Sequence, residues 1–147
     1  MTAFTAELTA KQDEISAMTE RVTAFLADCG IDDRAAHHMV LVLDELLTNV
    51  AVHGASEAAV SVRLTVSPDR VTAEVVDGGK MFDPRVERTP NVSASAEERP
   101  VGGLGLWLVH RVTEDLAYER AGERNRTAFS ICRAPAEKGR GGGNGAG

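Results

Sequence analysis

The stretch that decides the fold reads DRAAHHMVLVLDELLTNVAVH and runs from Asp33 to His53. Apolar residues recur along it at the three- and four-residue spacing of a helix: Met39, Val40, Val42, Leu43, Leu46, Leu47 and Val50. Such a broad apolar face predicts a helix at the centre of the core. Asp32 or Asp33 offers the N-cap, and Gly54 follows the last residue.

On both sides of this helix the periodicity predicts further elements. Upstream, apolar residues at helical spacing indicate a first helix that Gly30 closes. Downstream the period changes to two, which predicts a β-hairpin, and a short helix and a second hairpin follow. The expected elements, in chain order, are helix 6–28, helix 33–53, strands 60–66 and 71–77, helix 104–112, and strands 116–120 and 126–132.

The order of these elements predicts the fold class. Hairpins joined to separate helices indicate an α+β two-layer sandwich, with the helices on one face of a mostly antiparallel sheet. A length of 147 residues suits one domain, which we place at 1–134. The Gly-rich tail 135–147 is expected to be disordered. We expect Trp107, in the short helix, to belong to the core.

Composition and charge narrow the class of protein. The net charge of −6 argues against direct binding to nucleic acid or to an anionic membrane. We find no apolar run of the roughly 18 residues that a membrane helix needs, and no secretory signal at the start. Two cysteines, Cys29 and Cys132, suggest a reducing compartment rather than a disulfide framework. The sequence therefore predicts a cytoplasmic protein.

Three polar residues are spaced four apart on the long helix: Glu45, Asn49 and His53. Side chains at i and i+4 share one helical face, so the three form a narrow polar stripe. A solvated edge of the helix is one reading of this stripe. The other is a carboxylate and an amide oxygen aimed at one ligand, a pair of hard donors that suits Mg²⁺.

The second candidate motif follows the second predicted strand and reads Asp77-Gly78-Gly79. A carboxylate just past a strand can face a cleft, and glycine lets a ligand approach the backbone closely. An ionised carboxylate accepts hydrogen bonds, for example from the exocyclic amine of adenine. A plain Asp-Gly turn explains the same residues equally well.

The third motif is Gly103-Leu104-Gly105 at the start of the short helix, at the end of a glycine-containing stretch over 78–105. Backbone N–H groups and the positive end of the helix dipole at this position suit a phosphate. A flexible hinge is the alternative. A loop as long as this stretch is usually functional or mobile.

The order and spacing of the three motifs resemble the N, G1 and G2 boxes of the GHKL ATPase superfamily. The stretches LDELLTNVAVHG, DGGKMFDP and GGLGLWLV are similar to the anti-sigma factor/serine-protein kinase family of the RsbW and SpoIIAB type. The resemblance covers about 6–132 and implies the Bergerat ATP-binding fold. Met81 departs from the family pattern, which often has a glycine there, and a side chain at this position is expected to restrict the turn.

The resemblance implies a site for ATP and Mg²⁺. Asn49 would hold the Mg²⁺ that bridges the phosphates, and Glu45 would be the base for a substrate hydroxyl. Asp77 would accept from the adenine amine, and 85–101 would form the ATP lid. The other implied nucleotide-binding residues are Gly79 beside the base, Gly103 and Gly105 at the phosphates, and Thr127 beside adenine.

The activity that the resemblance implies is a serine/threonine protein kinase and anti-sigma-type partner-switching regulator. It would phosphorylate a STAS-domain antagonist (an anti-anti-sigma protein) and sequester an effector such as a sigma factor, as a homodimer. The alternative is a binding-only module in which ATP orders the lid and no phosphate moves; the presence of Glu45 favours the kinase. A histidine-kinase catalytic domain ranks low, because we expect no room for a phosphoacceptor helix pair.

Overall fold

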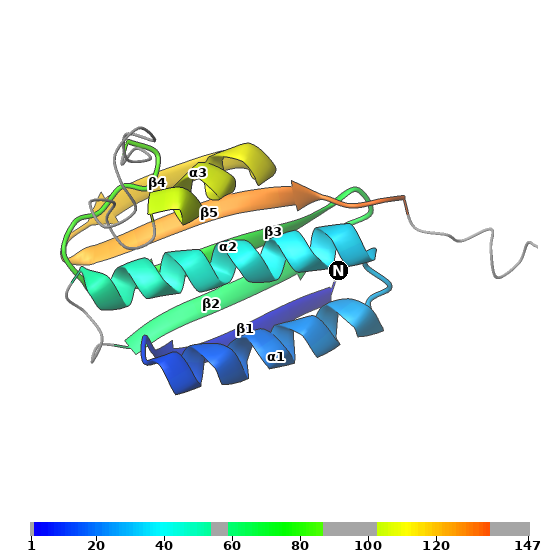
Figure 1. Cartoon of the computed structure of the whole chain (residues 1–147), viewed down its shortest axis with the longest axis horizontal. Coiled ribbons are helices and arrows are strands. Elements are labelled where there is room, and N and C mark those ends of the chain that lie inside the picture. Colours follow the sequence, from blue (N-terminus) through cyan, green and yellow to red (C-terminus); the bar gives the residue numbers. More distant parts are fainter. Residues whose placement is uncertain (1, 54–58, 87–102, 136–147) are drawn as a thin grey trace, which may run out of the picture.

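A two-layer arrangement of helices on a sheet is present in the computed structural model, which describes residues 2–53, 59–86 and 103–135. Five antiparallel strands form the sheet, in the order β1-β2-β3-β5-β4, and helices cover one of its faces (Figure 1). The α+β class predicted from the sequence is therefore confirmed. The elements are β1 (Thr2–Thr9), α1 (Gln12–Asp28), α2 (Asp33–Val52), β2 (Ala59–Val66), β3 (Arg70–Asp77), α3 (Gly103–Val112), β4 (Glu114–Ala121) and β5 (Arg124–Cys132).

The start of the chain corrects the sequence-based prediction. The helix expected over 6–28 begins only at Gln12, and Thr2–Thr9 forms the edge strand β1. This segment pairs with β2 along its whole length, from Thr2 opposite Val66 to Thr9 opposite Ala59. Its residues alternate between sheet faces, so Leu8 is buried by the two-residue period of a strand and not by the helical spacing.

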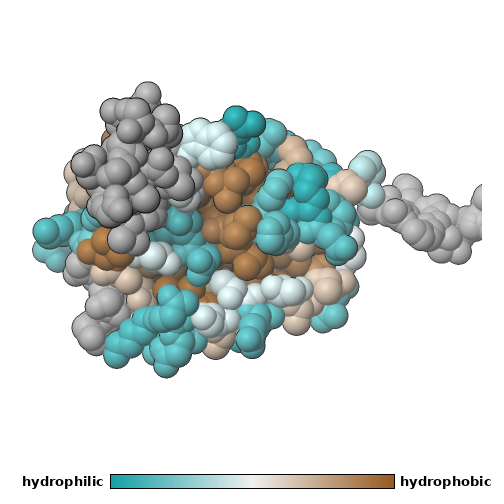
Figure 2. All heavy atoms as spheres, in the orientation of Figure 1, coloured by the Kyte–Doolittle hydropathy of each residue, from teal (hydrophilic) through white to brown (hydrophobic). Residues whose placement is uncertain are grey.

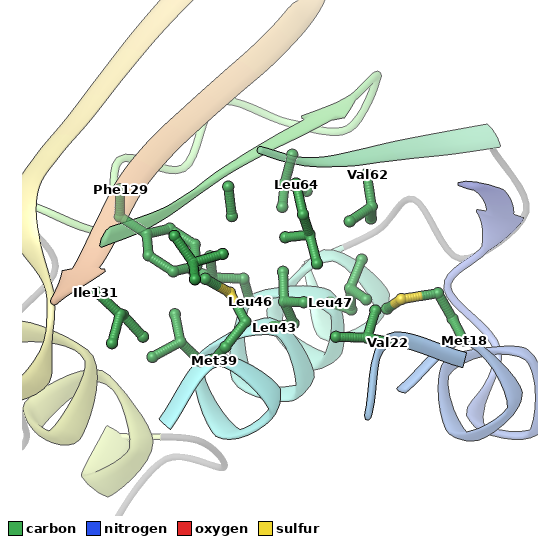
Figure 3. Packing of buried hydrophobic residues seen from close by; sticks show 14 of the residues in the cluster. Met18, Val22, Met39, Leu43, Leu46, Leu47, Val62, Leu64, Phe129 and Ile131 are labelled. Atoms are coloured by element: carbon green, nitrogen blue, oxygen red, sulfur yellow. The ribbon is translucent and has the colours of Figure 1, made fainter. Parts of the chain in front are cut away.

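The core lies between α2 and the sheet, as the sequence predicts. Figure 3 shows Met39, Leu43 and Leu47 of α2 facing the strands, with side chains of α1 beside them. The strand residues that meet them are apolar and fully buried: Val60, Val62, Leu64, Val71, Ala73, Val75, Phe129 and Ile131. By length and apolar composition alone α2 could cross a membrane. Core helices pass the same test, and α2 packs its apolar side on the sheet.

Trp107 does not join this core, so the expectation for it is wrong. Of the α3 residues whose burial is described (105–112), Leu106 and Val109 are buried, and each helical residue is turned by about 100° from the last. Trp107 consequently lies outside, 47% exposed, with the Arg111 guanidinium 4.9 Å from its ring centre. Figure 2 shows the helix-bearing side, where hydrophobic residues gather in the middle and hydrophilic ones surround them.

Asp32 ties the start of α2 to the end of β5, and we expect Asp32→Ala to lower the free energy of unfolding by about 1–2 kcal/mol. Its carboxylate accepts from Ala35 N at 3.2 Å and from Ala134 N at 2.7 Å. Burial opposes ionisation of this carboxyl, but the Ala134 and Ala35 N–H donors outweigh it and lower its pKa. The contribution is therefore present at neutral pH and is lost below about pH 4.

Urea unfolding at pH 7 and at pH 3 checks this prediction. Asp33→Ala is the matched control, because Asp33 lies in the same helical turn and the cap is made by Asp32. The two substitutions should differ clearly at pH 7 and much less at pH 3. An equal loss for both at pH 7 would contradict the role given to Asp32.

Candidate functional site

A pocket opens between the C-terminal half of α2 and the ends of β3 and β5. It encloses about 400 Å³ of space outside protein atoms, part of it open to solvent. Helix α2 supplies one wall, the sheet the floor, and the chain that follows β3 the opposite wall. The lining residues are Leu46, Asn49, Val50, His53, Val75, Asp77, Gly79, Lys80, Phe82, Pro84, Asn125 and Thr127.

Four residues predicted from the sequence line this one pocket: Asn49, Asp77, Gly79 and Thr127. They come from three elements that are distant in the chain. Strands β3 and β5 are neighbours in the sheet, and their register places Val75 opposite Thr127. Asp77 therefore ends its strand two residues from this pair, on the same face of the sheet.

The Asp77 carboxylate is held by hydrogen bonds on one side only. It is 7% exposed, and its Oδ2 accepts from Gly79 N at 2.8 Å and from Asn125 Nδ2 at 3.0 Å. No residue in the described part of the chain donates to Oδ1. An acceptor at the floor of a pocket suits a ligand group that carries N–H or O–H.

Asn49 brings a buried amide to the α2 wall of the pocket. It is 3% exposed, and its Nδ2 has no hydrogen-bond partner within the described ranges. One helical turn further on, the ring of His53 stacks on that of Phe82, with centres 4.4 Å apart. A buried amide without a partner is costly in a folded protein, which points to a ligand contact at this position.

Glu45 lies one turn before Asn49, outside the residues that line the pocket. Its Oε2 is buried and finds no hydrogen-bond partner among the described residues. Burial raises the pKa of this carboxyl above its ordinary value, and the neighbouring Asp44 carboxylate adds to the rise. Perturbed carboxyls of this kind are found preferentially at functional sites.

Helix α3 reaches the same region through Gly105. A Cβ added to Gly105 would lie 1.9 Å from Oε1 and 2.0 Å from Cδ of Glu45. The absent side chain thus lets the Glu45 carboxyl lie against the first turn of α3, whose first residue is Gly103. Gly105 is not among the described residues that line the pocket. The phosphate contacts expected of Gly103 and Gly105 stay a prediction.

Other expectations concern the segment that follows Asp77. Met81 is 68% exposed, and in the described part of the chain Asp115 is the one non-glycine residue with positive φ. A side chain at Met81 is therefore accommodated without backbone strain, contrary to the expectation that it restricts the turn.

Most of the predicted lid (85–101) and of the predicted tail (135–147) lies outside the described residues.

The sequence-based prediction missed a group of residues on β4 and β5. Asn125 donates to Asp77, accepts from Tyr118 Oη at 2.5 Å and accepts from Arg120 Nη1 at 3.0 Å. Arg120 Nη1 also donates to the Gly79 carbonyl at 2.7 Å. No sequence motif marks these residues, because only the register of the sheet brings them to the pocket.

The arrangement of fold and pocket defines a class of protein: an α+β domain that places a buried carboxylate and a helical amide around one pocket. The Histidine kinase-like ATPase domain family matches residues 8–131. The chain belongs to this family. ATP is accordingly the ligand that family membership implies for the pocket.

Curated relatives are distant but span most of the chain. The chain is 24% identical over 120 residues to the serine-protein kinase RsbW of Listeria monocytogenes, covering 77% of this chain and 76% of the relative. It is 27% identical over 100 residues to the serine/threonine-protein kinase BtrW of Bordetella bronchiseptica, covering 66% and 70%. Both relatives carry the name of a protein kinase.

Solved structures support the fold. The RsbU and RsbW domains of Rv1364c from Mycobacterium tuberculosis superpose with a TM-score of 0.65 at 15% identity, over 92% of this chain. This chain spans 33% of that longer one. The catalytic domain of histidine kinase ThkA gives a TM-score of 0.51 at 15% identity, covering 88% of this chain and 96% of that one.

Proposed function

We propose that the chain is a Mg·ATP-dependent protein kinase that transfers the γ-phosphate of ATP to a serine or threonine of a partner protein. The observation that carries the proposal is the placement of Glu45 on α2. Glu45 is half-buried with its Oε2 fully buried, and it lies one helical turn from Asn49, outside the residues that line the pocket containing Asp77. A base in that position meets the far end of a nucleotide whose adenine is bound at Asp77.

The residues present fit a magnesium ion that arrives with ATP. In the described ranges no group of three or more His, Cys, Asp or Glu residues is arranged to hold a metal ion. Mg²⁺ commonly takes few protein ligands and completes its shell with phosphate oxygens and water. Asn49 is buried and lines the pocket, and its side-chain carbonyl oxygen Oδ1 would supply such a single oxygen ligand. When bound, the ion would neutralise charge on the transferring phosphate.

Glu45 would act on the substrate hydroxyl. Its Oε2 lacks a hydrogen-bond partner among the described residues, and the carboxylate would accept the proton of a serine or threonine hydroxyl. Its raised pKa brings it closer to the operating pH, which is the condition for an effective general base. Phosphoryl transfer asks little else of the protein beyond positioning and electrostatic stabilisation.

The partners belong to the same proposal. We propose that the chain phosphorylates a STAS-domain antagonist, sequesters an effector such as a sigma factor, and works as a homodimer in the cytoplasm. The family resemblance supports these partners, and the two relatives named as kinases support the transfer. Phosphate added at an interface breaks a complex by like-charge repulsion and desolvation cost, which would free the kinase to rebind its effector.

Nucleotide-dependent capture tests the proposed function. The immobilised chain is exposed to an extract of its source organism with a non-hydrolysable ATP analogue, and Mg·ATP then replaces the analogue. We expect one captured protein to leave with a new phosphoserine or phosphothreonine that mass spectrometry detects. If ATP is bound and no captured protein gains a phosphate on a hydroxyl, the chain is a binding-only module instead.

The close approach of α3 to Glu45 yields a prediction for Gly105→Ala. The added Cβ overlaps the Glu45 carboxyl, and the end of that side chain moves more easily than the helix backbone. We therefore expect a folded variant in which the base is displaced and phosphotransfer falls by about 10²-fold, since ångström misplacements cost that much. Phosphotransfer rate and thermal unfolding, measured together, check it.

Gly78→Ala is the matched control for this variant. Its Cβ would meet only the Glu123 carbonyl oxygen at 3.8 Å, an ordinary contact. Unchanged phosphotransfer in Gly105→Ala would show that the glycine does not seat the base.

A further inference from the structure

We propose that Asn125 is a specificity-determining residue of the adenine subsite, which holds Asp77 so that the pocket selects a purine with an amino group over one with an oxo group. The proposal deepens the function above and rests on the assignment of ATP to this pocket. It assigns to Asn125 of β5, and to the β4 residues that hold it, a part in nucleotide selection that no sequence motif suggested.

The sheet places Asn125 at the centre of this subsite. It lies on β5, directly opposite Asp77 on β3 and directly opposite Arg120 on β4. It is 3% exposed, so its amide must find its partners within the protein or in a ligand. Strands β3 and β5 therefore present Asp77 and Asn125 on the pocket floor, and β4 places Arg120 directly beside Asn125.

The partners of the Asn125 amide fix its orientation. On one side it meets groups that only accept: Asp77 Oδ2 at 3.0 Å and the Lys80 carbonyl at 2.8 Å. On the other side it meets donors, the Tyr118 hydroxyl and the Arg120 guanidinium. A flipped amide would set acceptor against acceptor and donor against donor, so Nδ2 must face Asp77.

This orientation determines which face Asp77 offers to a ligand. Its Oδ2 already accepts two N–H groups, from Gly79 and from Asn125. Rotation of the carboxylate would break both bonds, so Oδ1 remains the acceptor available to the pocket. The 6-amino group of adenine donates to such an oxygen, whereas the 6-oxo group of hypoxanthine would oppose acceptor with acceptor.

Asn125 also holds the wall beside the base. Its Nδ2 contacts the Lys80 carbonyl, and Arg120 Nη1 bridges its Oδ1 to the Gly79 carbonyl. The segment after Asp77 and the carboxylate itself are thus fixed by the same amide. Loss of the amide frees both at once, and buried polar groups left without partners add to the effect.

The test compares binding of ATP and ITP by calorimetry in wild type and Asn125→Ala. We expect wild type to prefer ATP by about 10–100-fold, as sites that hydrogen-bond one substrate group reject the analogue that lacks it. In Asn125→Ala the ATP affinity should fall by about 10-fold or more while the ITP affinity changes less. The ratio of the ATP affinity to the ITP affinity should therefore approach one. If both affinities fall equally and the ratio is kept, Asn125 is only structural and the proposal fails.

Two further variants keep this test decisive. Ser130→Ala removes the 3.0 Å hydrogen bond to Thr72 between the same two strands, away from the pocket, and should leave the ratio unchanged. Tyr118→Phe deletes one donor to Asn125 and should lower the ratio of ATP affinity to ITP affinity a few-fold. This variant tests the proposal if Asn125→Ala does not fold. Wild type that binds no ATP would overturn the ATP site itself, a result distinct from failure of this inference.

Discussion

Glu45→Gln is expected to transfer phosphate about 10²–10⁴-fold more slowly than wild type while it binds ATP with nearly unchanged affinity. The amide keeps the volume of the side chain but cannot take the proton of the substrate hydroxyl. Glu45 does not line the adenine pocket, so the nucleotide keeps its contacts there. Steady-state phosphotransfer and calorimetric ATP binding, measured on the same preparation, check the prediction.

A second readout of this variant is its stability. Burial raises the pKa of Glu45, so the folded state binds its proton more tightly than the unfolded state does. The contribution to stability is therefore fully present below the ordinary pKa of a glutamate, about 4.3, and is lost as the pH rises through the folded pKa. Glu45→Gln should accordingly melt at a higher temperature than wild type at neutral pH.

Asp44→Asn is the matched control for phosphotransfer, because Asp44 is the exposed neighbour of Glu45 on α2. It should retain phosphotransfer. Equal losses of ATP binding and phosphotransfer in Glu45→Gln would contradict the role of base and make Glu45 part of the binding site instead.

The second large effect is expected for Asp77→Asn, which should weaken ATP binding by about 10²-fold, in keeping with roughly 1–3 kcal/mol for an unsatisfied buried group. Gly79 N and Asn125 Nδ2 both donate to this side chain, so the new amide must turn its oxygen toward them. Its NH₂ group then faces the pocket and meets the adenine amine, donor against donor.

Calorimetric titration with ATP checks this prediction. Glu74→Gln is the control, because Glu74 lies on the same strand and pairs with Arg126, outside the pocket. An ATP affinity that is unchanged in Asp77→Asn would refute the adenine contact.

Much of the fold was predictable because burial follows local periodicity in most elements. Helix α2 and the first hairpin carry patterns of period 3.6 and two, and these elements and the second hairpin were placed within a few residues. Strand β1 was missed because Leu8 continues the helical spacing of α1, whereas pairing with β2 decides its conformation. Trp107 was misplaced because a short apolar helix does not reveal which side faces the sheet.

Only those site residues that stand in a recognisable sequence motif were predictable from the sequence. Asn49 and Asp77 stand in recognisable local patterns, and the fold brings them to one pocket. Asn125 stands in no such pattern, since its role depends on the register of three strands. The contact between Gly105 and Glu45 depends likewise on the packing of α3 beside α2, which spacing along the chain does not determine.

In the proposed reaction the pocket that contains Asp77 binds ATP, the γ-phosphate passes directly to a protein hydroxyl, and Glu45 takes the proton of that hydroxyl. The most direct test incubates γ-labelled Mg·ATP and extract proteins with wild type or with Glu45→Gln, at concentrations that give equal ATP occupancy. We predict an acid-stable labelled protein with wild type alone, because phosphate esters of serine and threonine survive acid. Bound ATP without any acid-stable label, or the same label with both proteins, would contradict the account.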